Sequence, residues 1–197
     1  MKKYKSTQHS CYRRRGWSLI ELLTVVVVLG IVAVITIPYG AFGASAAGQS
    51  AARLLVTEML AAQMDAVATQ SFRRVHFYDD GTGWCVLELT SSQLNDPFDA
   101  ETATYAEDAI ESQGQNQQSV VHFVQDMRFK DVSIMNPIFD MNSSDVTFDP
   151  TGGIVANNGS PSLGGSVKVA SGAYSWVLTV GPLTGKISIS ESLGIDK

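Results

Sequence analysis

The sequence has few of the residues that enzyme sites and metal centres require. Its 197 residues include two cysteines and three histidines, and none of His9, His76 and His122 has another ligand residue at metal-site spacing. It contains no G-x-S-x-G, P-loop or G-x-G-x-x-G motif. Calcium could bind an acidic loop, but EF-hand spacing is absent, and we interpret the loop carboxylates as solvated turn residues. These are Asp79, Asp80, Asp96, Asp99 and Glu101. We therefore expect no enzymatic activity and no cofactor.

Acidic residues are absent from the start of the chain, because none precedes Glu21. Six of the 14 basic residues lie before Gly16, which leaves eight basic and 19 acidic residues after it, a formal charge of −11. A body with this charge should repel nucleic acid and anionic lipid, so no nucleic-acid partner is expected. We interpret Trp17, Trp84 and Trp176 as membrane-interface and core residues, not as a platform for stacked bases.

One apolar run, residues 17–37, contains a single charged residue, Glu21. At about 1.5 Å per residue it is long enough to cross the roughly 30 Å hydrocarbon core of a bilayer. Its basic flank lies on the N-terminal side, which places residues 1–15 in the cytoplasm and the body outside it. The membrane would then separate Cys11 from Cys85, so we expect no disulfide between them and a buried Cys85 thiol.

The apolar run ends at Pro38, and glycines and small residues follow it. We predict a kinked or partly unwound joint over residues 38–48. From Gln49 the helical period returns, and its apolar positions should pack on a core. These positions are Leu55, Met59, Ala62 and Ala66.

After Ser71 the pattern becomes that of β-strands. Residues 73–89, RRVHFYDDGTGWCVLEL, predict a hairpin whose turn lies at 79–83. Residues 91–119 are polar and acidic and predict a long excursion from the domain. Further strands are expected in SVVHFV, RFKDVSIM, DVTF, GSVKVA, YSWVLTV and GKISIS. One long helix followed by these strands predicts an α+β fold with an antiparallel sheet.

The N-terminal segment permits three interpretations. It could be a secretory signal peptide cleaved at the A-x-A site of residues 44–46, although its apolar core is long for one and contains Glu21. It could be a degenerate twin-arginine signal built on Arg14 and Arg15. The strong hydrophobicity of the span argues against this interpretation. The third interpretation accounts for the glutamate.

Residues 13–38, RRRGWSLIELLTVVVVLGIVAVITIP, closely resemble the class III signal of type IV pilins and type II secretion pseudopilins. Gly16, Glu21 and Pro38 lie where that family places them, whereas Trp17 replaces the commoner Phe or Met and the leader is long. The resemblance implies that a prepilin peptidase cleaves after Gly16 and methylates the new amine of Trp17. It also implies that the Glu21 carboxylate pairs with the N-terminal amine of a neighbouring subunit during assembly. Such pairing would offset the cost of a carboxylate in lipid.

Three segments of the body resemble the GspH/FimT group of minor pseudopilins and minor pilins: residues 54–86, 146–153 and 181–189. The resemblance implies a pilin-like fold, in which a long N-terminal helix packs on an antiparallel, β-sandwich-like C-terminal domain. Its implied parts are a cleaved leader (1–16), a transmembrane and assembly helix (17–37), a joint with the amphipathic half of the helix (38–72) and a periplasmic domain (73–197).

The function that this resemblance implies is that of a minor pseudopilin, a structural subunit of the type II secretion pseudopilus that drives export of folded proteins. It would be anchored in the bacterial inner membrane, with other pseudopilins, the prepilin peptidase and the inner-membrane secretion platform as partners. The alternative is a FimT-like minor pilin of a type IV pilus, active in adhesion or DNA uptake. DNA uptake would require exposed cations near the C-terminus, where Lys186 and Lys197 are offset by Glu191 and Asp196.

Overall fold

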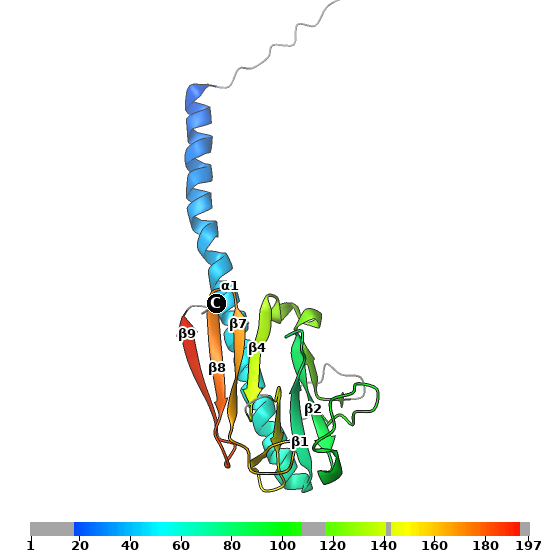
Figure 1. Ribbon diagram of the computed structural model, residues 1–197. Coiled ribbons are helices and arrows are strands. Elements are labelled where there is room, and N and C mark those ends of the chain that lie inside the picture. The colour runs from blue at the N-terminus through cyan, green and yellow to red at the C-terminus, as the bar shows by residue number, and fades with distance from the viewer. Residues whose placement is uncertain (1–17, 108–116, 141–142, 194–197) are drawn as a thin grey trace, which may run out of the picture. The chain divides into compact units, whose positions relative to one another are not determined.

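The structure is a computed structural model that describes residues 18–107, 117–140 and 143–193 (Figure 1). Side chains are described for these residues except 34–43 and 192–193. The chain divides into two compact units, Met1–Gly40 and Ala41–Lys197. One long helix and two antiparallel sheets form the α+β fold that the sequence predicts.

The described chain begins with a single long helix, α1 (Leu19–Thr69). Ser18 caps its first turn, because the Ser18 hydroxyl oxygen accepts a hydrogen bond from the backbone N–H of Glu21 at 3.3 Å. The helix ends at Thr69, because the next residue, Gln70, has a left-handed φ of +54° that stops the helical repeat. The N–H of Ser71 then donates back to the carbonyl of Ala66, which satisfies one of the last helical acceptors.

The helix continues through residues 38–48, where the sequence predicts a kinked or partly unwound joint. The unwound form of that prediction is wrong. Pro38 removes one backbone donor, but the alanines among residues 41–47 are strong helix formers and favour continuation of the helix. Gly48, which looked like a helix-weakening residue, has a packing role, because it lies against the ring of Trp176.

The first sheet has the strand order β3-β2-β1-β5-β6. Its strands are β1 (Phe72–Phe77), β2 (Gly83–Leu89), β3 (Val120–His122), β5 (Asp145–Phe148) and β6 (Ile154–Val155). The predicted hairpin is confirmed, with Val75 opposite Val86. Its turn is held by the Asp80 carboxylate, which accepts from the N–H of Thr82 at 2.9 Å. The short strand β6 was not among the predicted strands.

The second sheet has the strand order β4-β7-β8-β9. Its strands are β4 (Val132–Phe139), β7 (Gly165–Ser171), β8 (Tyr174–Val180) and β9 (Ile187–Leu193). The start of β4 differs from the prediction, because Arg128 lies in a 3₁₀ helix, η4 (Met127–Phe129). The strand also continues past Pro137, because a bulge between Met135 and Ile138 accommodates this residue.

The predicted excursion, residues 91–119, is partly packed on the domain in its described portions. It starts with a 3₁₀ helix, η1 (Ser91–Gln93), and buries Leu94 and Ala106. The N–H of Ala106 donates to the carbonyl of Val86 at 2.9 Å, so this portion extends the edge of the first sheet. A second 3₁₀ helix, η3 (Phe123–Gln125), follows β3.

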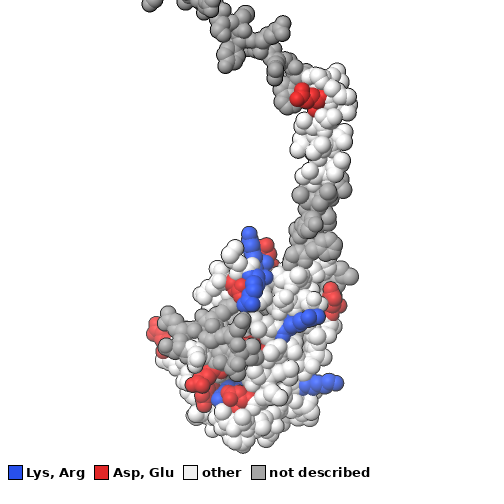
Figure 2. Space-filling view, turned by 180° about the vertical axis from the view of Figure 1, so that it is seen from behind, with Lys and Arg blue, Asp and Glu red and all other residues white. Residues whose placement is uncertain are grey.

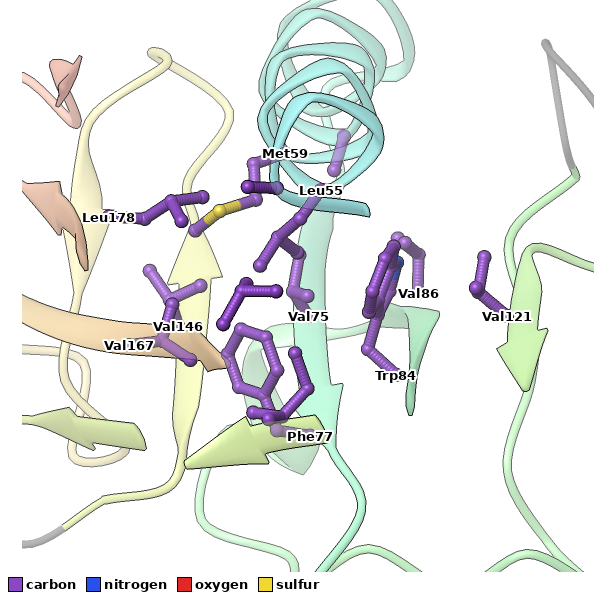
Figure 3. Close-up of a cluster of buried hydrophobic side chains, with 14 of the residues drawn as sticks. Leu55, Met59, Val75, Phe77, Trp84, Val86, Val121, Val146, Val167 and Leu178 are labelled. Carbon is purple, nitrogen blue, oxygen red and sulfur yellow. The ribbon is translucent and has the colours of Figure 1, made fainter. Parts of the chain in front are cut away.

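The C-terminal half of α1 packs on both sheets through the apolar positions that the sequence predicts. All four, Leu55, Met59, Ala62 and Ala66, are buried. Figure 3 shows Leu55 and Met59 directed toward side chains of both sheets. These include Val75 and Val146 of the first sheet and Val167 and Leu178 of the second. Trp84, Cys85 and Trp176 are also buried, as predicted.

Candidate functional site

The N-terminal part of α1 has an apolar surface that is exposed among the described side chains. Large apolar side chains from Leu19 to Val32 are exposed, and the exposed fraction is 85% for Leu19 and still 41% for Val25. Exposed apolar area on this scale indicates a surface that is covered by lipid or by another protein. Among the described residues, no helix has an apolar run long enough to cross a membrane. The predicted span, residues 17–37, extends at both ends beyond the described side chains.

Glu21 is the one charged residue on this surface, and it is exposed in the first turn of α1. Its backbone N–H donates to both the carbonyl oxygen of Ser18, at 3.0 Å, and the Ser18 hydroxyl. The spacing of Ser18 and Glu21 is that of a capping box, and a carboxylate in the first turn interacts favourably with the positive end of the helix dipole. The cap therefore fixes the backbone of Glu21 in the first turn of the helix, and its side chain is exposed, where a neighbouring cation could reach it.

The other predicted site residues are only partly within the description. Gly16 and Trp17, the predicted cleavage and methylation positions, lie outside the described residues. Pro38 lies within α1, and its side chain is among those not described. Of the predicted set, only Glu21 is fully described.

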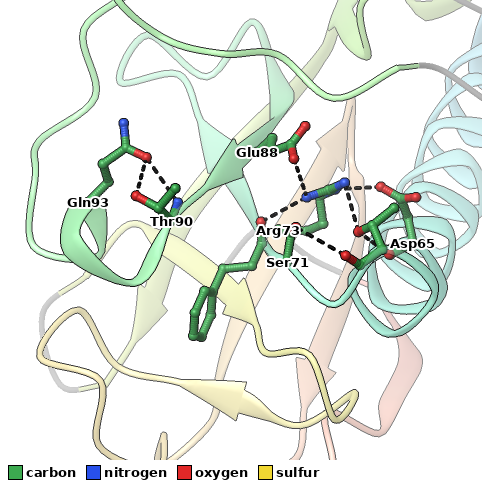
Figure 4. Close-up of polar contacts among 8 residues, drawn as sticks. Asp65, Ser71, Arg73, Glu88, Thr90 and Gln93 are labelled. Atoms are coloured by element: carbon green, nitrogen blue, oxygen red, sulfur yellow. Dashed lines mark hydrogen bonds and ion pairs between the residues drawn. The ribbon is translucent and has the colours of Figure 1, made fainter.

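A polar cluster that was not predicted from the sequence lies at the C-terminal end of α1 and is centred on Arg73 (Figure 4). Its guanidinium donates to the Asp65 carboxylate and, at 3.0 Å, to the Thr69 hydroxyl, and it lies 3.6 Å from a carboxylate oxygen of Glu88. The Arg73 side chain is only 4% exposed. The sequence does contain one signal for this cluster, because two adjacent arginines occur in an otherwise apolar strand. Arginines in such a position are buried only when they are paired, so buried ion pairs could have been expected here.

The adjacent Arg74 is buried on the opposite face of β1. It donates to the carbonyls of Leu94 and Asp96, the latter at 2.8 Å, and so holds the start of the 91–119 segment against the sheet. Burial lowers the pKa of Arg74, and the Asp145 carboxylate, 3.9 Å away, opposes that shift. Asp145 also accepts a 2.7 Å contact from the His76 ring, which occupies an ordinary sheet position, as predicted.

These groups do not form a recognisable catalytic or metal centre. Within the described ranges, no three His, Cys, Asp or Glu side chains are placed to hold a metal ion. The Asp80 and Asp99 carboxylates accept hydrogen bonds from their own turns, which lowers the pKa of each.

A pocket beside α1 is lined by Glu58, Asp65 and Glu107, and Glu58 accepts from the Ser119 hydroxyl at 3.2 Å.

The charges on the globular unit are of both signs. On the face drawn in Figure 2, the blue Lys and Arg side chains and the red Asp and Glu side chains are interspersed, without a continuous blue patch among the coloured residues.

The chain was compared with known proteins. A family model described as "Type II transport protein GspH" matches residues 51–184. No curated protein matches the chain. One solved structure with some likeness is the minor pseudopilin EpsH from the Type 2 Secretion System of Vibrio cholerae. It is 11% identical, with a TM-score of 0.43, and the match covers 75% of this chain and 95% of that one.

The matched segment begins in the buried half of α1 and ends between β8 and β9, so it includes the packed face of the helix and nearly all of both sheets. It covers well over half of the chain. The chain therefore belongs to the GspH family of type II transport proteins and is a minor pseudopilin of the type II secretion system.

Proposed function

We propose that this minor pseudopilin is made as a precursor, is cleaved after Gly16, and enters the pseudopilus through the helix that begins at the N-methylated Trp17. The observation that carries the proposal is the exposed apolar helix with one carboxylate, Glu21, in its first turn. Residues 17–37 would hold the precursor in the inner membrane, with the globular unit in the periplasm. The prepilin peptidase and the inner-membrane secretion platform would act on this precursor in turn.

Glu21 has a specific task in this proposal. A carboxylate near a helix centre costs about 2.5–3.5 kcal/mol on membrane-insertion scales, and less near the helix end. The cost is offset when a neighbouring pseudopilin brings the methylated amine of its first residue to this carboxylate. An ion pair in a low dielectric does more to define the register of two helices than to add net stability. The Ser18 cap supports this task, because it fixes the backbone of Glu21 in the first turn of the helix.

The protein would act as a structural subunit, without enzymatic activity and without a cofactor. Several of its described polar groups are engaged in turns and ion pairs, as for Asp80 and Arg73. The formal charge of −11 after Gly16 supports the absence of a nucleic-acid partner. Its partners would be other pseudopilins, contacted side by side along the N-terminal helices.

Replacement of Glu21 tests the proposal, because it separates membrane insertion from assembly. Glu21→Ala removes a charge that is costly in lipid, so the precursor should insert and be cleaved as in wild type. Crosslinks to partner pseudopilins should then fall at least tenfold, and secretion should fail. Thr24→Ala is the matched control, because its hydroxyl bonds to the carbonyl of Glu21 in the same helix, at 2.8 Å. Wild-type crosslinking and secretion by Glu21→Ala would refute the assembly role.

A further inference from the structure

The sheets end in four edge strands in the part of the chain that the structure describes, and three of them are short or interrupted. The first sheet ends in β3, with three residues, and in β6, with two. The second sheet ends on one side in β4, which contains Pro137, a bulge, and Asn136 at a φ of +47°. Short length, proline and bulges are the features by which proteins prevent unwanted pairing at a sheet edge.

The fourth edge strand, β9, has none of these protections. It has seven residues, ISISESL, with neither proline nor lysine and a single charge, Glu191. Its register with β8 is unbroken from Ile187 to Leu193. No described strand lies on its outer side. A long, regular and nearly uncharged edge is a template for pairing with another strand.

The ladder with β8 shows which backbone groups of β9 are free. The N–H of Gly181 donates to the carbonyl of Lys186 at 2.8 Å, so these two opposed residues form a hydrogen-bonded pair. Bonded and non-bonded pairs alternate in antiparallel ladders. Ser188 and Ser190 therefore direct their N–H and C=O groups toward β8. The residues between and beside them, Ile187, Ile189 and Glu191, direct theirs outward.

The side chains of β9 also alternate. Ile187, Ile189 and Glu191 lie opposite Val180, Leu178 and Trp176, so they share the core-facing side of the sheet. Ile187 packs against the core, whereas Ile189 is 45% exposed. Ser188 and Ser190 lie on the other side. A pairing strand would therefore find an apolar row beside Ile189 and a polar row beside the serines.

The direction of β9 restricts which chain can supply that strand. Gly48 of α1 lies against Trp176, near the start of β8, whereas Gln63 donates to the carbonyl of Thr184, beyond its end, at 3.2 Å. In the globular unit β8 therefore runs in the same direction as α1, and β9 runs against it. A strand that pairs antiparallel with β9 must run in the direction of α1.

We propose that the outer edge of β9 binds an edge strand of a different subunit of the same pseudopilus. This inference rests on the proposed function and adds one condition, that the part of α1 within the globular unit runs in the same direction in neighbouring subunits. In a second copy held in that direction, the edge strand with the required direction is β4, because it pairs antiparallel with β7 and β7 with β8. Pro137 and the bulge make β4 unsuitable. The partner strand therefore belongs to another polypeptide, alternates apolar and polar residues, and places a Lys or Arg opposite Glu191.

Residue-resolved hydrogen exchange tests this pairing on the full chain. We would compare the detergent-extracted subunit with the same chain in membranes that contain the other pseudopilins. The amides of Ile187, Ile189 and Glu191 should exchange rapidly in the extracted subunit and at least tenfold more slowly after assembly. The amides of Ser188 and Ser190, bonded to β8, should be protected in both states. Unchanged exchange at the three outward amides would overturn the proposal.

Proline scanning and photo-crosslinking supply a second, independent test. Ile189→Pro removes an outward N–H and no bond to β8, whereas Ile189→Thr removes the apolar side chain and keeps that N–H. A photo-crosslinker in place of Ser190 should form an adduct whose mapped peptide is an extended segment of another pseudopilin. Ile189→Pro should reduce this adduct at least tenfold, and Ile189→Thr should retain most of it. Adducts with only a second copy of the chain would overturn the choice of partner.

The same preparation separates this proposal from the proposed function. Cleavage at Trp17 and Glu21-dependent crosslinks report on helix-mediated assembly. If both are present and the β9 amides stay unprotected, the edge proposal alone is wrong. If neither is present, both proposals are wrong, because the edge proposal depends on assembly. Should Ile189→Pro fail to fold, exchange in the wild-type chain still decides the question.

Discussion

Arg73 of β1 donates through Nε to the carboxylate of Asp65, which lies eight residues earlier on α1. The two residues flank the end of the helix, and the guanidinium also reaches Thr69 and Glu88. One buried side chain thus ties the last turns of the helix to the first two strands of the sheet. This connection sets the position at which the helix passes into the hairpin.

Replacement of Arg73 should destabilise the globular unit. Arg73→Met keeps much of the buried length and removes the charge, so Asp65 and Glu88 lose their partner. We expect a loss of about 1.5–3 kcal/mol in the free energy of unfolding, the range for hydrogen bonds to charged groups. Urea unfolding followed by tryptophan fluorescence measures it. The control is Arg128→Met, whose ion pair with Asp126 is exposed and should cost less than about 1 kcal/mol. Equal losses in the two variants would contradict this account.

Gly48 should not tolerate a side chain, although it lies within a helix. Alanine is favoured over glycine by about 1 kcal/mol at exposed helix positions. At Gly48, however, a Cβ atom would lie 2.1 Å from the ring of Trp176, which is only 2% exposed. The clash should outweigh the propensity, with a net loss of about 1–3 kcal/mol for Gly48→Ala in thermal or urea unfolding. Ser50→Ala, at an exposed position of the same helix, should be neutral or stabilising. Stabilisation by Gly48→Ala would show that Trp176 is not held where we describe it.

Cys85 should be chemically inert in the folded protein. Burial raises the pKa of its thiol to about 12, so almost none is thiolate near neutral pH. In a Cys11→Ser variant, which leaves one thiol, maleimide labelling at pH 8 should proceed only at the rate of unfolding. Labelling faster than unfolding would contradict the buried position.

The raised pKa of the Cys85 thiol should also lower the free energy of unfolding at alkaline pH. The pKa of Cys85 is higher in the folded chain than the value of about 8.5 in the unfolded chain, so the folded state keeps the proton longer. The unfolded state therefore binds fewer protons above about pH 8.5, and stability decreases as the pH rises toward 12. Burial also raises the pKa of Tyr78, which acts in the same direction above about pH 10. Between pH 8.5 and 10, Cys85→Ala should show a flatter decline of the urea midpoint than wild type.

Much of the fold follows from local patterns. The period of Leu55, Met59, Ala62 and Ala66 predicted the buried helix face, and the Asp-Gly-containing turn predicted the hairpin. The strands DVTF and YSWVLTV were predicted with their observed bounds. Each of these depends on neighbours in the sequence, so the sequence alone specifies it.

The remaining features depend on contacts between distant segments. A glycine such as Gly48 resembles a helix breaker until the ring of Trp176, 128 residues later, is seen against it. The continuation of β4 past Pro137 depends on a bulge, and the order of strands within each sheet depends on long-range pairing. The unpaired edge of β9 could not be predicted, because its sequence resembles that of a central strand. At the candidate site, the sequence motif indicated Glu21, and the structure adds the Ser18 cap.

The mass of the mature N-terminus tests the central claim most directly. We would purify the full-length chain from membranes of a cell that carries the secretion system and sequence its N-terminal peptide by mass spectrometry. The account predicts a chain that begins at Trp17 with a methylated amine, which leaves Glu21 as the fifth residue. A chain that begins at Ala47, after the A-x-A site of residues 44–46, would lack the assembly helix and would contradict the proposal that this protein enters the pseudopilus through it.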